Sequence, residues 1–293
     1  MKGTALCLIA AIVLGIQIPL AKLAYLNGTD PYTFALFRSA IAVPFFLIMA
    51  RARNRPFAIS RQAAIPFALV TISMTAIAFG YLGALDRLQA GLAALLFYLA
   101  PIMVVVASAV LARVWPGAMV LVIVAMAFAG LVLVFGPSFD VLDPIGLGLG
   151  ILAALGATLY FMTVPSLQRH MSAIVTMAWS NLIIAVLYVP IVAGNVNLPD
   201  GGMGWFWFIA AAASYSIGLG LAFPAVEQAG SSRAAILFNI EPVAVIALSI
   251  PLLGELMTPV QYLGAAIVLV ALVLASRQKT PGPAPTVTQR EAP

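Results

Sequence analysis

Apolar residues fill ten long stretches of this chain, and short polar segments separate them. About 20 apolar residues in a helix cross a bilayer core, and each stretch is close to that length. The segments between them are rich in Gly, Pro, Asn and Asp, which favour turns. The pattern therefore predicts ten transmembrane helices, near residues 3–25, 31–50, 63–84, 89–112, 115–135, 144–165, 173–193, 203–225, 231–252 and 258–276.

The chain also repeats itself. Segment 93–101 returns 141 positions later as 234–242, with Phe97 on Phe238 and Pro101 on Pro242 and no gap. Two similar halves in series explain this match. Five helices per half is an odd number, so the second half enters the membrane from the opposite side. Such inverted repeats are typical of secondary transporters, which bind substrate between the halves.

Composition supports a membrane protein. The chain is 63% hydrophobic and 8% charged, whereas soluble domains carry about 25% charged residues. The net charge is +5, but the basic residues are scattered through short connections, so no nucleic-acid partner is expected. Cys7 and His170 are the only cysteine and histidine. They allow neither a disulfide nor a Cys/His zinc site, and we expect no metal or other cofactor.

The positions of Lys and Arg predict the orientation. Cytoplasmic loops of membrane proteins carry an excess of these residues. With the N-terminus in the cytoplasm, that side holds most of them: Lys2, Arg51, Arg53, Arg55, Arg61, Arg113, Arg169, Arg233, Arg277, Lys279 and Arg290. The other side holds Arg87 and Lys22. We expect a multi-pass protein of the cell inner membrane with both termini in the cytoplasm.

At this point the chain resembles the EamA-type transporters of the drug/metabolite transporter (DMT) superfamily. The resemblance rests on the ten short helices in two halves, Phe37-Arg38-Ser39 in the second span, the mid-span prolines, and Leu253-Gly254-Glu255. The first half departs from the last motif, because Arg113-Val114-Trp115 stands there. The resemblance implies EamA-like repeats at 1–138 and 139–276. A polar tail, 277–293, follows them, and we expect it to be disordered. The resemblance further implies a central cavity lined by spans 1–4 and 6–9, alternating access, and often export of amino acids, including aromatic ones.

Two prolines are candidate kinks. Pro101 and Pro242 lie inside apolar spans, where proline removes a helix donor and frees the carbonyl four residues back. These carbonyls belong to Phe97 and Phe238. Broken helices at matching positions of two halves point to a binding site. A packing kink without ligand contact is the alternative.

Aromatic and polar residues within the spans are candidate substrate contacts. Tyr98 and Asn239 correspond under the 141-residue shift and differ in chemistry, as a site for an asymmetric substrate would. Further aromatic groups could stack on a flat or cationic ligand, or could serve packing alone: Tyr81, Tyr160, Trp179 and Tyr215. Gln17, Ser180 and Asn181 are weaker candidates.

Two charged residues lie deep in the spans. A carboxylate such as Glu241 is costly within a bilayer. It could carry a proton, bind a substrate ammonium, or be a structural carboxyl paired with Arg38 or Arg233. Arg38 could bind a carboxylate through two hydrogen bonds, or serve structure or gating.

The sequence shows no catalytic arrangement, so we expect no enzyme activity. The first hypothesis is a secondary transporter, monomeric or homodimeric, that exports aromatic or hydrophobic amino acids. A carrier of other small organic molecules or drugs is the alternative. An intramembrane enzyme and a membrane protein without transport activity are the hypotheses of another class.

Overall fold

The computed structural model describes residues 2–111, 113, 117–135, 143–229, 237–238 and 240–277. These residues are helical apart from short connections, and no strand occurs among them. The helices are α1 (Lys2–Leu26), α2 (Pro31–Ala52), α3 (Ala64–Arg87), α4 (Ala90–Phe97), α5 (Ala100–Leu111), α6 (Ala118–Phe135), α7 (Pro144–Leu167), α8 (Ala173–Val192), α9 (Gly201–Ala229), α11 (Ile240–Leu253) and α12 (Pro259–Arg277).

The predicted all-helical membrane fold is confirmed. In the described residues, seven helical spans are long and apolar enough to cross a bilayer, and three shorter apolar helices accompany them. Together they match the ten predicted spans. Many large apolar side chains are exposed on the outside of the bundle, among them Ile48, Leu111 and Phe128. Such a surface suits hydrocarbon as the solvent.

Local chemistry explains where two helices begin. The Asp30 carboxylate accepts hydrogen bonds from the backbone N–H groups of Tyr32 and Thr33 at 2.8 and 3.0 Å. Asp143 caps α7 in the same way, through Ile145 at 2.7 Å and Gly146 at 3.1 Å. In both cases a proline follows the cap, and proline suits the first helical position because its missing N–H would have no partner there.

Helices of one half pack mainly against helices of the other. The most extensive contacts join α1 to α9, α3 to α7, α2 to α8, and α6 to α12. The 141-residue shift places α1 on α7 and α3 on α9, so the first two contacts are equivalent. Gly80 lets α3 approach the α7 backbone closely, since a Cβ there would lie 2.5 Å from the Leu149 carbonyl oxygen. The fold therefore follows the internal repeat.

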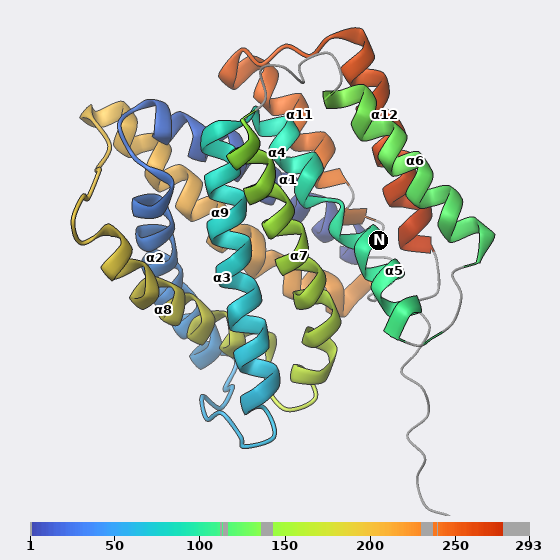
Figure 1. The fold of residues 1–293 in the computed structure, drawn as a ribbon. Helices are drawn as coiled ribbons and strands as arrows, with labels where there is room; N and C mark the ends of the chain where they lie inside the picture. The colour runs from blue at the N-terminus through green and yellow to red at the C-terminus, as the bar shows by residue number, and fades with distance from the viewer. Residues whose placement is uncertain are drawn as a thin grey trace, which may run out of the picture.

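The fifth and tenth spans lie at the edge. Figure 1 shows α6 and α12 side by side, at the right of the bundle, and outside the group formed by α1, α3, α4 and α7. The buried core includes residues of both halves, among them Ile123 of α6 and Val268 of α12.

The fourth span is broken in two. α4 ends at Phe97, Tyr98 and Leu99 form a turn, and α5 begins at Ala100, directly before Pro101. The Tyr98 N–H still bonds to the Ala94 carbonyl at 2.9 Å. The break places Tyr98 at a non-helical position in the interior of the bundle, where its side chain is 7% exposed.

The helix bundle has two ends, the Glu255 end and the Arg51 end. The Glu255 end carries the connections α1–α2, α3–α4, α8–α9 and α11–α12 and the start of α7. The Arg51 end carries the connections α2–α3 and α7–α8.

Candidate functional site

The first polar cluster surrounds Arg38 of α2. Its side chain is only 7% exposed, and Nε has no hydrogen-bond partner. The guanidinium carbon lies 4.0 Å from the centroid of the Tyr215 ring and 6.0 Å from that of Phe34. Among the described residues no carboxylate forms an ion pair with Arg38. A buried cation therefore rests on an aromatic face without a counter-charge from the described residues.

Hydrogen bonds hold the aromatic partner of Arg38 in place. The Tyr215 hydroxyl donates to Oδ1 of Asn181 at 3.3 Å. The Asn181 side-chain NH₂ donates to the Met177 carbonyl, one turn earlier in α8, at 2.9 Å. This second bond orients the amide, so that its oxygen faces Tyr215. Asn181 thus fixes the position of the ring beneath Arg38.

Two further tyrosines complete this cluster. Tyr25 of α1 and Tyr188 of α8 interact electrostatically with Arg38, and both hydroxyls are buried without a hydrogen-bond partner. Neither residue was predicted from the sequence. Each lies near the end of its span, where an interfacial aromatic belt is the ordinary interpretation. The buried side of these helices becomes evident only from the fold.

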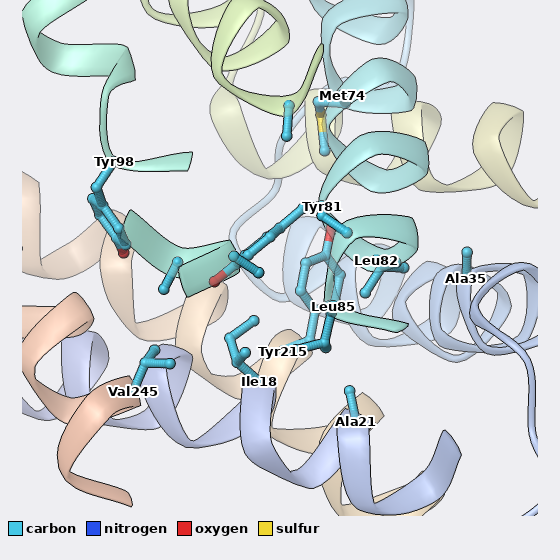
Figure 2. Packing of buried hydrophobic residues seen from close by; sticks show 14 of the residues in the cluster. Ile18, Ala21, Ala35, Met74, Tyr81, Leu82, Leu85, Tyr98, Tyr215 and Val245 are labelled. Carbon is cyan, nitrogen blue, oxygen red and sulfur yellow. The ribbon is translucent and has the colours of Figure 1, made fainter. Parts of the chain in front are cut away.

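The second polar cluster surrounds Glu241, in the first turn of α11, where its side chain is half-buried. The carboxylate lies close enough to the hydroxyls of Tyr81 and Tyr98 to interact electrostatically with both, and Tyr98 is the nearer. Neither hydroxyl forms a hydrogen bond of normal geometry. Figure 2 shows both tyrosines in one region of the core, above Ile18 of α1 and Val245 of α11.

Aromatic stacking sets the position of these tyrosines. The Tyr81 ring stacks on Phe97 at a centroid distance of 4.8 Å and an interplanar angle of 6°. Phe97 in turn meets the Tyr98 ring edge-on at 5.3 Å and 82°. The break after α4 thus presents Phe97 and Tyr98 to α3, and the second cluster has an aromatic wall.

The remaining predicted aromatic residues lie apart from Glu241. Tyr160 lies near Tyr215 and packs edge-on against Phe161 at 5.5 Å. Trp179 donates from Nε1 to the Phe57 carbonyl at 3.0 Å. That bond attaches the α2–α3 connection to α8 at the Arg51 end, so Trp179 serves a structural contact in this conformation.

Several predicted residues cannot be placed. Asn239 and Arg233 lie outside the described residues, as do the side chains of Pro101 and Pro242. Gln17 of α1 is described; it is 4% exposed, and its side-chain nitrogen has no hydrogen-bond partner.

The predicted site residues are packed rather than open in this conformation. Tyr81, Tyr98 and Tyr215 are each less than a tenth exposed. A groove of about 570 Å³ runs between α3, α7 and α8 and borders the first cluster at Tyr188; its lining is almost wholly apolar and also includes Phe79. A central cavity remains a prediction. Among the described residues no group of three His, Cys, Asp or Glu side chains could hold a metal ion.

Known proteins agree with this architecture. A solved structure titled "Crystal structure of protein" is 16% identical, superposes with a TM-score of 0.66, and matches over 94% of this chain and 97% of its own. That likeness concerns the fold alone. No curated protein sequence matches the chain. The family model of the EamA-like transporters matches twice, at residues 1–136 and 144–277. The chain therefore belongs to the EamA-like transporter family, a branch of the DMT superfamily, and is a multi-pass membrane protein with two family repeats.

Proposed function

We propose that the protein exports zwitterionic amino acids with an aromatic or apolar side chain across the inner membrane by alternating access. The family supports transport of a small molecule. The observation that carries the substrate class is Arg38, a buried cation without a protein carboxylate among the described residues.

The two clusters carry opposite charges, and each could bind one charged end of an amino acid. A guanidinium binds a carboxylate through two parallel hydrogen bonds, and Arg38 has an unpartnered N–H to offer. A carboxylate binds an ammonium, and Glu241 has two tyrosine hydroxyls beside it that could accept further N–H bonds. Buried polar groups without partners in a native protein call for an explanation, and an absent ligand is one.

The aromatic residues favour an apolar or aromatic side chain on the substrate. Three aromatic rings form a wall next to Glu241: Tyr81 stacks on Phe97, and Phe97 meets Tyr98 edge-on. Tyr215 covers one face of Arg38. Aromatic pairs contribute about 0.5–1.5 kcal/mol beyond the burial of area. A flat apolar side chain would thus gain more from this surface than a polar one.

Alternating access requires the tightly packed conformation to open. The broken fourth span is a natural place for that change, because two separate helices meet at the turn of Tyr98 and Leu99. Movement of α4 against α3 would separate Phe97 from Tyr81 and expose the hydroxyls beside Glu241.

Substrate analogues test the proposal directly. Purified protein in proteoliposomes should transport phenylalanine, and should transport phenethylamine and 3-phenylpropanoate much more slowly, since each lacks one charged end. Equal rates for all three would contradict zwitterion recognition. Transport of none of them, or of other small molecules only, would reject the amino-acid assignment.

Glu241→Gln separates the two functional roles of that carboxyl. If Glu241 carries protons, accumulation driven by a pH gradient should be lost while exchange of labelled for unlabelled substrate continues. If it binds the substrate ammonium, both should weaken. Unaltered accumulation and affinity would leave Glu241 with a structural role.

The proposed orientation has a separate test. In a chain whose Cys7 is replaced by Ala, single cysteines at Asn54 and Leu198, both exposed, should react with a membrane-impermeant thiol reagent from opposite sides. We expect the Asn54 position, and with it the Arg51 end, to be cytoplasmic. Labelling of both positions from one side would contradict the topology.

A further inference from the structure

Lys22 and Glu255 form a partly buried ion pair at the Glu255 end. The Lys22 Nζ and Glu255 Oε1 atoms are 3.2 Å apart, and the two side chains are 16% and 13% exposed. The second carboxylate oxygen, Oε2, accepts a hydrogen bond from the backbone N–H of Ala90 at 2.8 Å. Lys22 also donates to the carbonyl of Leu88. Two side chains therefore hold both ends of the short α3–α4 connection.

These contacts join the two halves of the protein. Lys22 belongs to α1 and Ala90 begins α4, both in the first half, whereas Glu255 lies between α11 and α12 in the second. Gly254, at φ +67°, turns the chain in a conformation that favours glycine and brings Glu255 to the start of α4. The carboxylate thus also meets the positive end of the α4 dipole.

Few other contacts join α1 directly to α4, although α11 packs against both. α1 packs mainly along α9 and α11. The α3–α4 connection leads directly into α4, whose far end carries Phe97 and the turn at Tyr98. Movement of α4 away from α1 would therefore have to break the bonds of Lys22 and Glu255.

The corresponding positions of the repeat lack these charges. Under the 141-residue shift, Lys22 corresponds to Thr163 and Glu255 to Val114. Neither can form an ion pair. A transporter of two equivalent halves needs a closing contact at each end, and only one of the two corresponding sets of positions carries opposite charges.

We propose that Lys22, Glu255 and the α3–α4 connection form a one-sided latch that must open before the Glu255 end can admit or release substrate. In the orientation proposed above this is the outer end. The inference rests on the proposed transport function, yet it concerns a conformational equilibrium that exists without any substrate.

The reaction rate of a buried cysteine with a thiol reagent measures how often the Glu255 end opens. Ile18 lies one helical turn from Lys22 on the same face of α1 and is 2% exposed. In proteoliposomes of the Cys7→Ala protein, an Ile18→Cys reporter should react slowly with a membrane-impermeant thiol reagent supplied at the Glu255 end. Glu255→Gln and, separately, Lys22→Met should raise that rate about tenfold, the change expected for losing one charge-assisted hydrogen bond.

A matched control breaks another ion pair at the same end. Arg87 and Asp143 are joined at 2.7 Å but are 40% and 32% exposed, and they connect α3 to α7, which pack together along their length. Asp143→Asn should leave the Ile18→Cys rate unchanged. An equal rise in this variant, or no rise in the two latch variants, would overturn the proposal.

A second reporter separates opening from loss of folding. Leu167, at the last residue of α7 near the Arg51 end, is 1% exposed. A Leu167→Cys reporter should react at an unchanged or lower rate in the latch variants, since alternating access opens one end at a time. A rise at both reporters would show general loosening and would also refute the latch. No substrate enters these measurements, so their outcome is independent of the amino-acid assignment.

Discussion

Replacing Arg38 by Met tests the proposed carboxylate site most directly. Methionine keeps a long apolar stem and removes the guanidinium. The effect on folding is the balance of two terms. Loss of the cation–π contact with Tyr215, at 4.0 Å, costs about 2 kcal/mol for a desolvated pair. Removal of a buried charge without a carboxylate partner returns its desolvation penalty, which is several kcal/mol. We therefore expect the melting temperature of Arg38→Met to stay the same or rise.

The effect on substrate affinity should have the opposite sign. Hydrogen bonds to charged groups are worth about 1.5–3 kcal/mol, and 1.4 kcal/mol corresponds to a factor of ten. If Arg38 binds the substrate carboxylate, Arg38→Met should weaken the affinity for phenylalanine about 10- to 150-fold. Phenethylamine has no carboxylate, so its weaker affinity should not change. Arg38→Lys keeps the charge without the planar fork and should give an intermediate loss.

Measuring affinity and stability together distinguishes a substrate-binding role of Arg38 from a structural one. Affinity is measured by binding or concentration-dependent uptake in proteoliposomes, and stability by thermal unfolding in detergent. A melting temperature that falls while transport stays normal would give Arg38 a structural role. Equal losses for phenylalanine and phenethylamine would show that the guanidinium does not read the carboxylate.

Two further predictions concern stability. Gly80→Ala should lower the free energy of unfolding by about 1–3 kcal/mol, because the new Cβ would meet the α7 backbone at the Leu149 carbonyl. Gly148→Ala is the control: its new Cβ would meet no neighbouring element within 4 Å. This variant should be neutral or raise stability by up to about 1 kcal/mol. The second prediction concerns Asp143, whose hydrogen bond with Arg87 holds its pKa below the ordinary range. The ionised carboxylate therefore stabilises the fold above a pH of about 4. This stabilisation is lost as the pH falls through the lowered pKa. Asp143→Asn, which keeps the cap, should therefore lower the melting temperature at neutral pH and match the parent protein at low pH; a constant difference at every pH would contradict this account.

The helices could be predicted from the sequence because the bilayer dictates their length and composition. The predicted spans 31–50 and 173–193 match α2 (Pro31–Ala52) and α8 (Ala173–Val192) closely. The polar segments between spans are short and carry strong turn residues. The break of the fourth span was also indicated, by Pro101, although the turn lies just before that residue.

The faces of the helices could not be predicted, and the candidate site depends on them. Nearly every side of these helices is apolar, so periodicity does not distinguish the lipid face from the core. Tyr25 and Tyr188 were missed for this reason. Trp179 was a candidate substrate contact with packing as the alternative, and its indole N–H donates to the carbonyl of Phe57, a residue 122 positions away. Such a pairing follows from tertiary packing alone.

We expect the chemistry of this transporter to lie where the two halves depart from the internal repeat. Under the shift that aligns the halves, Arg38 falls on Trp179, Glu241 on Ala100, and Lys22 on Thr163. The helices and their contacts are repeated, but these charges are not. A scaffold of two equivalent inverted halves alone would treat both sides of the membrane, and both ends of a substrate, alike. The buried Arg38 cation lies in the first half and the half-buried Glu241 carboxylate in the second, which removes that equivalence. Direction and substrate polarity should therefore be altered by exchanging these unmatched residues, while exchange of matched packing residues should alter stability alone.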